Sequence, residues 1–282
     1  MTTPARKHIF LDFDGTITTA DTIGALAQFA LDTQSARGSD LSAAWEQVVK
    51  AYMQGFKACV DNHHTPSHQR TTVGQEVEFL RQMKDSEVES LERIRECEVF
   101  RGIGADDFRN AGRRLVEQGT IQLREGFHEY VSRRIAEGCK VWVLSVNWSS
   151  AFIEGACHPS VVSVIANNVG SDGSIVGPEL FLSPRSADHR TLTNSVDKLD
   201  AMRAALQGEG FGQTTTVYMG DSITDMECLL AADQAVIMSD KADSTLLQTL
   251  RRIGTDVKHI AEADPGSIAW ASSFDDIEKR VL

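Results

Sequence analysis

The chain has 282 residues, of which 41% are hydrophobic, and a formal net charge of −12. This length suffices for one large core, or for a core domain with a smaller inserted one. The acidic balance argues against nucleic acid as a partner, because phosphate neutralisation needs clustered Lys and Arg. No run of 18 apolar residues or apolar signal core is present, and the five cysteines include no Cys-x-x-Cys pair. We therefore expect a cytoplasmic protein with reduced thiols and no membrane partner.

The first predicted element is a buried parallel strand at residues 8–11, an apolar run that ends in Leu11. Asp12 and Asp14 follow it, and residues two apart in a strand point to the same side. Two adjacent carboxylates repel each other and resist desolvation, and Mg²⁺, which prefers carboxylate oxygens, relieves both costs. Gly15 permits a sharp turn. The alternative interpretation of this stretch is an ordinary Asp-Gly turn after a strand.

The next hundred residues predict helices and no convincing strand. Good N-cap residues at 18–22 precede the first helix. Helical spacing of apolar residues predicts helices at 23–31, 41–60, 73–83, 88–99 and 106–117.

Two groups of side chains in this helical region are interpreted as structural. His63, His64 and His68 share a loop in which Pro66 breaks helical spacing, so we favour a solvated loop over a metal site. Four further residues recur at helical spacing, and we expect them to form the core of the helical region rather than a substrate platform. They are Trp45, Tyr52, Met53 and Phe56.

Beyond residue 120, strands alternate with helices, which argues for a parallel sheet covered on both faces. Helices are predicted at 127–136, 196–206 and 225–231, and strands at 141–144, 161–166, 214–219 and 235–238. Asp172-Gly173 predicts a hairpin within 168–182. The segment 184–194 is interpreted as a loop in which His189 and Arg190 are candidates for substrate contact. The simplest architecture is a doubly wound α/β core, residues 1–17 and 121–282, with an all-helical domain, residues 18–120, inserted after the first strand.

Three further stretches lie at, or just beyond, the carboxyl ends of predicted strands, where ligands of open α/β sheets collect. The stretch from Ser145 through Val146 and Asn147 offers a hydroxyl and free backbone N–H groups for a phosphoryl oxygen. Asp221 and Asp225 share one face of a helix that begins there, and Lys198 lies on the helix at 196–206. Taken singly, these stretches are also typical of an N-cap, a complement to a helix dipole and a solvated surface lysine.

In combination, the stretches resemble the four-motif signature of the haloacid dehalogenase superfamily. The motifs are Asp-x-Asp-Gly-Thr at 12–16, Ser145, Lys198 and Gly-Asp-x-x-x-Asp at 220–225, so the resemblance covers most of the chain. An all-helical insertion directly after the first motif is similar to the subfamily I cap. The sequence Leu-Arg-Glu-Gly-Phe at 123–127 is similar to the phosphoserine phosphatase branch. That branch also contains phosphocholine-type, methylthio-phosphopentane and thiamine monophosphate phosphatases.

The resemblance implies a Mg²⁺-dependent phosphatase that hydrolyses a small phosphorylated metabolite through an aspartyl-phosphate intermediate. Asp12 would be the nucleophile, and Asp14 would protonate the leaving oxygen and then deprotonate the attacking water. Mg²⁺ would be held by Asp12, the Asp14 carbonyl oxygen and Asp221, with Asp225 binding directly or through water. Phosphoryl oxygens would be bound by Ser145, Val146, Asn147 and Lys198.

The sequence departs from the phosphoserine phosphatase pattern near these motifs. Asp21 stands where the phosphoserine enzymes have a glutamate that handles the substrate amine, and Asn147-Trp148 replaces the usual paired glycines. We therefore expect Asp21 and Trp148 to set specificity, and a substrate other than phosphoserine. Thr224 replaces the common asparagine of the fourth motif.

Three other functions remain open from the sequence. A carbon–halogen hydrolase needs the nucleophilic Asp but no metal, so Asp14, Asp221 and Asp225 count against it. A terpenyl phosphate or diphosphate phosphatase, or a related secondary-metabolite enzyme, keeps these carboxylates and would be favoured by an apolar, aromatic cap interior. A non-catalytic binding module usually loses a motif residue, and none is lost here. The leaving group and the oligomeric state, monomer or homodimer, are left open.

Overall fold

A seven-stranded sheet forms the centre of the molecule. The computed structural model describes residues 6–160, 162–181, 190–209, 214–264 and 266–279. Within these residues, every pair of neighbouring strands in the large sheet is parallel. Across the sheet the strands are β3 (Ser163–Ile165), β2 (Lys140–Leu144), β1 (Arg6–Leu11), β6 (Thr214–Gly220), β7 (Gln234–Met238), β9 (Ala269–Ala271) and β8 (Lys258–His259). The predicted doubly wound α/β core is confirmed.

The order of the strands reverses between β1 and β6. The chain adds β2 and β3 on one side of β1 and then crosses to β6 and β7 on the other. Open α/β sheets bind ligands at such a switch point, outside the carboxyl ends of the strands. Asp12 directly follows β1, and Asp221 directly follows β6. The topology therefore brings the first and last of the predicted motifs together.

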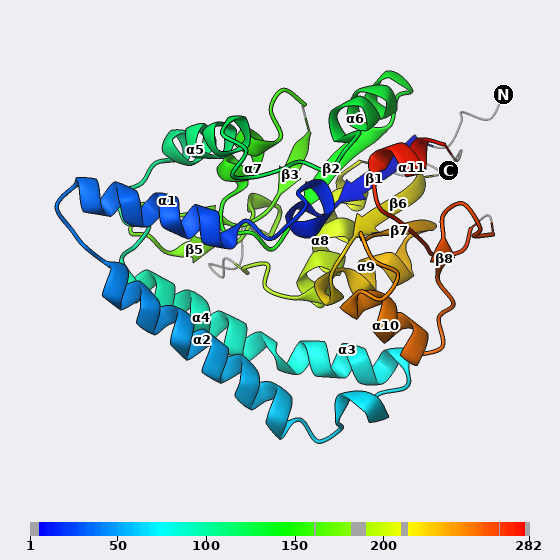
Figure 1. The fold of residues 1–282 in the computed structure, drawn as a ribbon, viewed down its shortest axis with the longest axis horizontal. Helices are drawn as coiled ribbons and strands as arrows, with labels where there is room; N and C mark the ends of the chain where they lie inside the picture. Colours follow the sequence, from blue (N-terminus) through cyan, green and yellow to red (C-terminus); the bar gives the residue numbers. More distant parts are fainter. Residues whose placement is uncertain (1–5, 161, 182–189, 210–213, 265, 280–282) are drawn as a thin grey trace.

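Alternating residues of β1 supply two separate cores. Ile9 and Leu11 belong to the core formed with α6 (Phe127–Ala136), α7 (Ser150–Ala156) and α11 (Phe274–Glu278). Phe10 belongs to the core formed with α8 (Ser195–Gly208), α9 (Met226–Ala231) and α10 (Thr245–Arg252). Both faces of the sheet are therefore covered, and Figure 1 shows the two groups of helices on opposite sides of the strands.

An all-helical insertion separates β1 from β2, as predicted. Its helices are α1 (Ile23–Ala36), α2 (Ser42–Asn62), α3 (Val73–Gln82), α4 (Lys84–Cys97) and α5 (Ala105–Glu117). In Figure 1, α2, α3 and α4 form an arm below the core, whereas α1 and α5 lie beside the core. Among all the helices in the described residues, none is long and apolar enough to cross a membrane.

The last helix of the insertion, α5, packs on the core helix α7 through two glycines. A Cβ atom at Gly112 would lie 2.2 Å from the carbonyl oxygen of Phe152, and one at Gly155 would lie 1.9 Å from the carbonyl oxygen of Arg109. Only a residue without a side chain allows two helix backbones to approach this closely. This contact ties α5 to the core.

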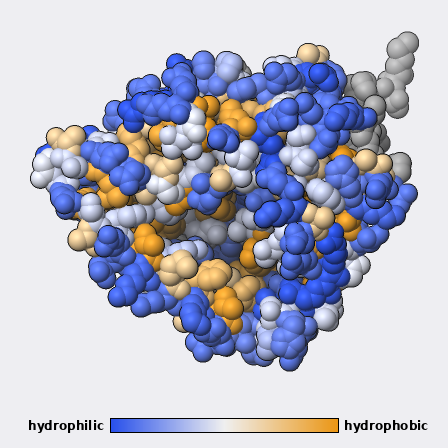
Figure 2. Space-filling view, viewed as in Figure 1, coloured by the Kyte–Doolittle hydropathy of each residue, from blue (hydrophilic) through white to orange (hydrophobic). Residues whose placement is uncertain are grey.

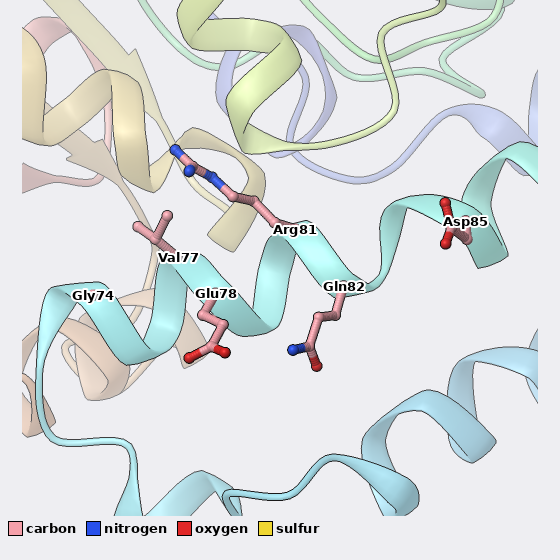
Figure 3. A pocket seen from close by; sticks show the side chains of 6 residues that line it. All are labelled: Gly74, Val77, Glu78, Arg81, Gln82 and Asp85. Carbon is pink, nitrogen blue, oxygen red and sulfur yellow. The ribbon is translucent and has the colours of Figure 1, made fainter.

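Ion pairs join the arm to the core where α3 meets α4. The ammonium of Lys84 lies 2.7 Å from Oδ1 of Asp197 on α8, and the guanidinium of Arg81 lies 2.9 Å from Oε1 of Glu227 on α9. Figure 3 shows Arg81 pointing from α3 toward the core and Glu78 pointing away from it. Both side chains line a groove of about 590 Å³. Because Asp197 and Glu227 are buried, each needs a cation or a hydrogen-bond donor nearby.

Most predicted elements are confirmed within a few residues. The helix predicted at 127–136 has these bounds, and the predicted hairpin is formed by β4 (Asn168–Val169) and β5 (Ile175–Val176). The helix predicted at 88–99 begins four residues earlier, at Lys84. The sequence does not predict α7 or the elements after residue 238, several of which are too short to show periodicity. His189 and most of the loop predicted at 184–194 lie outside the described residues.

Candidate active site

A tight turn after β1 carries the first two candidate residues. It is closed by a hydrogen bond of 3.0 Å from the Thr18 N–H to the Phe13 carbonyl oxygen, and Gly15 within it has a φ of +74°. A Cβ atom at Gly15 would lie 2.2 Å from Oδ2 of Asp221, so glycine is required here for space as well as for conformation. The turn thereby brings Asp221 against the residues that follow β1.

Lys198 lies between two buried carboxylates. Its ammonium is 2.9 Å from Oδ1 of Asp12 and 2.6 Å from Oδ1 of Asp225, and all three side chains are buried. Burial alone would lower the pKa of Lys198, but the charges of Asp12 and Asp225 outweigh it and raise the pKa. Burial, followed by the charge of Asp225, raises the pKa of Asp12 well above its usual range. Lys198 is thus a fully buried cation rather than a solvated surface residue.

Asp225 is surrounded by hydrogen-bond donors. Its Oδ1 accepts from Lys198 and from the hydroxyl of Tyr218, which lies 2.6 Å away. Its Oδ2 accepts from the backbone N–H groups of Asp221 and Ser222, both at 3.1 Å, and from the Ser222 hydroxyl. Although burial opposes it, the charge of Lys198 and these donors lower the pKa of Asp225. Asp225 therefore holds Lys198 and the loop after β6 in place.

Three carboxylates form a candidate metal site. Ligand oxygens of Asp12, Asp221 and Asp225 all lie within 4.8 Å of one another. Burial, followed by the charge of Asp225, raises the pKa of Asp221 to about 7. The Asp221 carboxylate accepts a hydrogen bond of 3.2 Å from the hydroxyl of Thr16. An all-oxygen, anionic donor set of this kind fits a hard divalent cation.

Asp14 is held by donors from two other segments. Its Oδ1 accepts from the N–H and the hydroxyl of Thr22, at 2.7 and 2.6 Å, and its Oδ2 accepts from Nδ2 of Asn147 at 2.9 Å. Burial raises the pKa of Asp14, although the hydrogen bonds from Thr22 and Asn147 oppose that shift. The Asp14 carboxyl group is therefore held in place by the segment before α1 and by the loop after β2.

The loop after β2 is fixed by buried hydrogen bonds. Ser145 is buried, and its hydroxyl accepts from the N–H of Asn147 at 3.1 Å. The side-chain amide of Asn167 donates to the carbonyl oxygens of Val146, Asn147 and Leu192 at 2.9–3.2 Å. Asn167 thereby connects the loop that contains Ser145 to the segment that precedes α8.

The two residues predicted to set specificity have different surroundings. Asp21 is exposed and accepts from the N–H of Ile23 at 2.8 Å. Trp148 is half-buried, and its ring lies edge-to-face against Trp45 of α2 and Phe100, with ring centroids 6.2 and 5.8 Å away. Asp21 also lines a cleft of about 280 Å³ beside Asp221.

Part of the aromatic stripe on α2 does not form the core of the helical region. Trp45 and Tyr52 are half-buried, and the Tyr52 hydroxyl lies 3.3 Å from Oε1 of Glu87. Met53 and Phe56, in contrast, are 59% and 36% exposed, so the prediction that they are core residues is wrong. The Phe56 ring lies beside that of Tyr52, with ring centroids 6.3 Å apart, but it stays exposed to solvent. Figure 2 shows a hollow at the centre of the drawn face, with hydrophobic residues around it.

The histidine-rich loop does not join the carboxylate site. Nδ1 of His63 lies 2.8 Å from the Thr65 carbonyl oxygen and 3.1 Å from the Thr65 nitrogen, and its ring packs edge-to-face against Phe79. Among the described residues, His63, His64 and His68 belong to no group of potential metal ligands.

Arg190, a candidate for substrate contact, forms ion pairs with Asp197 and Asp200.

Three residues of the site are not predicted by sequence reasoning. Asn167 follows the apolar run of β3, and the rule that ligands collect at strand ends would have found it. Tyr218 lies within the strand β6, where the sequence shows it only as one more residue of an apolar run. Thr22 is recognisable from the sequence only as an N-cap residue. Their roles depend on contacts with distant segments, which the sequence does not display.

Comparison with known proteins identifies a family. A family model described as haloacid dehalogenase-like hydrolase matches residues 9–230. The chain is 27% identical to the bifunctional TH2 protein, mitochondrial, of Arabidopsis thaliana over 269 residues, which cover 88% of this chain and 41% of that protein. It is 28% identical to a CTO1 family protein of Schizosaccharomyces pombe over 239 residues, which cover 81% of this chain and 80% of that protein. The chain thus spans less than half the length of the plant relative.

Solved structures share the fold. One is a phosphoserine phosphatase with an analogue of its phospho-aspartyl intermediate, with a TM-score of 0.53 and 17% identity over 99% of this chain and 100% of that one. Another is a substrate-bound phosphoserine phosphatase, with a TM-score of 0.52 and 15% identity over the same shares. At these identities the likeness concerns the arrangement of the chain.

Proposed function

The chain belongs to the haloacid dehalogenase-like hydrolases, and on this premise we propose that it is a Mg²⁺-dependent phosphatase of a small organic phosphomonoester. The observation that carries the proposal is Lys198, fully buried between Asp12 and Asp225 at the switch point of the sheet. Phosphoryl transfer needs positioning and charge neutralisation above all, and this arrangement supplies both. We further propose that residues 1–17 and 121–282 form the catalytic core and residues 18–120 a cap over it.

In the first half of the reaction, a carboxylate oxygen of Asp12 attacks phosphorus. The bond between phosphorus and the leaving oxygen breaks, and Asp14 gives its proton to that oxygen. Lys198 offsets the repulsion between the anionic nucleophile and the anionic phosphoryl group. Ser145 and the backbone N–H groups of Val146 and Asn147 bind phosphoryl oxygens, and the Asn147 N–H gives up its hydrogen bond to the Ser145 hydroxyl to do so.

In the second half, water attacks the phosphorus of the aspartyl-phosphate, and Asp14 takes the proton of that water. Inorganic phosphate leaves, and Asp12 returns to a carboxylate. Asp14 therefore acts first as an acid and then as a base, and it must stay within reach of both oxygens. Monoester hydrolysis is among the slowest uncatalysed reactions, with accelerations up to ~10²¹, so each of these positions matters.

The residues present fit a magnesium ion. Asp12, the carbonyl oxygen of Asp14 and Asp221 would hold it, and Asp225 would reach it through water because its own oxygens already accept from five donors. When bound, the ion supplies positive charge to the phosphoryl oxygens. Asp221, whose pKa is raised mainly by burial and then by the charge of Asp225, is the carboxylate whose negative charge such an ion would offset.

The leaving group would lie between Asp21 and the aromatic side chains around Trp148. The packing of Trp148 against Trp45 and Phe100 gives the proposed cap an aromatic lining, which also favours the alternative of a terpenyl phosphate or diphosphate. The five free cysteines support the reducing cytoplasm as the compartment.

A screen for phosphate release tests the proposal. The protein would be incubated with Mg²⁺ and a panel of phosphorylated metabolites that includes sugar, amino-alcohol, nucleotide, vitamin and isoprenoid esters. We expect turnover of one structural class well above the others. Absence of phosphate release from every ester, p-nitrophenyl phosphate included, would contradict the proposal, and preference for isoprenoid esters would select the alternative.

A further inference from the structure

We propose that Asn147 and Thr22 are positioning residues for Asp14, and that they leave Oδ2 of Asp14 as the oxygen that carries the transferred proton. The inference rests on the proposed function and concerns the same site. It assigns a task to Asn147 beyond phosphate binding, and to Thr22, which the sequence marks only as a helix N-cap. It also gives a reason for an asparagine at the position after the serine motif where paired glycines are usual.

Three segments converge on the Asp14 carboxyl group. Asp14 lies in the turn after β1, Thr22 directly precedes α1, and Asn147 lies in the loop after β2. Nδ2 of Asn147 lies 2.9 Å from Oδ2 of Asp14 and 3.2 Å from the hydroxyl of Thr22. Asn147 is 0% exposed and Thr22 is 2% exposed, so these bonds are not shared with bulk water. Buried hydrogen bonds of this kind hold a side chain in one orientation.

The orientation of the Asn147 amide is set by its surroundings. Its Oδ1 accepts from the backbone N–H of Ser149 at 3.3 Å. A flipped amide would point Oδ1 at the Asp14 carboxylate, which has no proton to donate when ionised. The amide nitrogen therefore faces Asp14, and the Thr22 hydroxyl, which accepts from this nitrogen, directs its own proton to Asp14.

Counting donors identifies the free position on Asp14. A carboxylate offers about two acceptor sites on each oxygen. Among the residues that the structure describes, Oδ1 has two donors, the N–H and the hydroxyl of Thr22, whereas Oδ2 has one donor, Asn147. A proton on Oδ1 would displace a donor of Thr22, but a proton on Oδ2 displaces none. The geometry points to Oδ2 as the atom that exchanges protons with the substrate.

The proton balance of the reaction follows from this assignment. As the oxygen of Asp12 bonds to phosphorus and the leaving oxygen departs, the proton on Oδ2 of Asp14 moves to the leaving oxygen. Asp14 is then a carboxylate, with Asn147 and Thr22 still donating to it. It takes a proton back on Oδ2 from the water that attacks the aspartyl-phosphate.

The need for this proton depends on the leaving group, and this gives a test. An alkoxide is a strong base and leaves poorly without a proton, whereas p-nitrophenolate is stable as an anion. The value of kcat/KM reports the steps up to departure of the leaving group and excludes hydrolysis of the intermediate. A variant that misplaces Asp14 should therefore lose kcat/KM for an alkyl ester and keep most of it for p-nitrophenyl phosphate.

We would measure kcat/KM for glycerol 2-phosphate and for p-nitrophenyl phosphate. The variants are Thr22→Val, which removes the hydroxyl at nearly constant size, its conservative partner Thr22→Ser, and Asn147→Leu. For Thr22→Val and Asn147→Leu we expect a loss of roughly 10- to 100-fold on the alkyl ester, the size typical of a misplaced catalytic group, and a loss within about threefold on the aryl ester. Thr22→Ser should retain wild-type values on both esters.

Ser150→Ala serves as the control variant. It removes a hydrogen bond to Asn168 from the first residue of α7, three residues after Asn147, and within the described residues Ser150 makes no hydrogen bond to Asp14. We expect it to leave both kcat/KM values unchanged. Equal losses on the two esters in Thr22→Val and Asn147→Leu, or no loss on either, would overturn the inference while leaving the proposed function standing. A wild-type protein that hydrolyses neither ester nor any panel member would overturn the proposed function, and the inference with it.

Discussion

The ammonium of Lys198 lies 2.6 Å from the Asp225 carboxylate, and neither side chain is exposed to solvent. Removing one member of a buried ion pair leaves the other uncompensated, at a typical cost of about 3–5 kcal/mol. We therefore predict that Lys198→Met lowers the free energy of unfolding by roughly this amount, because Asp12 and Asp225 both lose their cation. Urea denaturation would measure it. In Lys198→Met/Asp225→Asn the loss should be smaller than the sum of the single losses, and strict additivity would contradict the pairing.

A second prediction concerns the nucleophile. Asp12→Asn should abolish turnover, because an amide cannot attack phosphorus to form the acyl phosphate. The fold should remain, since Asp12 lies beyond the carboxyl end of β1 and Lys198 keeps Asp225 as its second partner. Phosphate release and the far-UV circular dichroism spectrum check the two parts. Retention of more than a few per cent of the activity would show that the covalent mechanism is wrong.

The third prediction concerns metal removal. EDTA should eliminate activity and Mg²⁺ should restore it, because the Asp12 and Asp221 carboxylates need a hard cation between them and the phosphate. Independently of activity, Mg²⁺ should raise the melting temperature of the wild type, since a ligand of the folded state stabilises it. Asp221→Asn should lose most of that increase. Full activity in metal-free buffer would reopen the carbon–halogen hydrolase alternative.

A fourth prediction separates specificity from chemistry. Trp148→Ala should change the preference among esters far more than it changes hydrolysis of p-nitrophenyl phosphate. The reason is that Trp148 packs with Trp45 and Phe100, whereas Ser145 and Lys198 are left in place. The measurement is the ratio of kcat/KM values for the best natural ester and p-nitrophenyl phosphate in both proteins. An unchanged ratio would mean that Trp148 only fills space in the fold.

The fifth prediction concerns pH and a residue outside the site. His8 is 0% exposed in β1, and burial lowers its pKa below the usual 6.5, assisted by Arg6 and Lys140 and opposed by Glu209. The unfolded chain therefore binds more protons than the folded one as the pH falls below about 6.5, and stability is lost in that range. Asp221, whose pKa is raised to about 7, contributes in the opposite sense over this range, so the contribution of His8 is read as a difference between two proteins. In urea denaturation between pH 7.5 and 5, the stability of the wild type relative to His8→Leu should fall as the pH is lowered. Identical slopes would contradict it.

Long apolar runs explain why much of the fold is predictable. The strands β1, β2, β6 and β7 are largely buried on both faces, so each contains a short apolar run that the sequence displays. Short elements such as β8, with two residues, carry no such signal. The first residue of α4, Lys84, pairs with Asp197 of the core, a tertiary contact that local spacing does not display. Local spacing alone places that start too late.

The candidate site likewise contains some residues that the sequence predicts and others that only the structure reveals. The positions of Asp12, Asp14, Ser145 and Asp221 follow from the rule that ligands collect at the carboxyl ends of strands, and their proposed roles stay predictions. The residues that hold them are found only in three dimensions. Tyr218 bonds to Asp225 from within a strand, and Asn167 reaches Leu192, 25 residues away along the chain. Sequence patterns therefore indicate which residues carry the reactive groups, but not which residues hold those groups in position.

The close contact between α5 and α7 at Gly112 and Gly155 limits which segments of this protein can be exchanged with those of its relatives in a chimera. Gly112 and Gly155 leave no room for a side chain on either helix, so the two helices form a matched pair. A chimera that takes the whole insertion from another family member would place a foreign α5 against Gly155, and any side chain at its crossing point would force the helices apart. A junction at Gly104, just before α5, keeps the pair within one parent. The segment that can be exchanged without disturbing the contact between α5 and α7 therefore ends after α4.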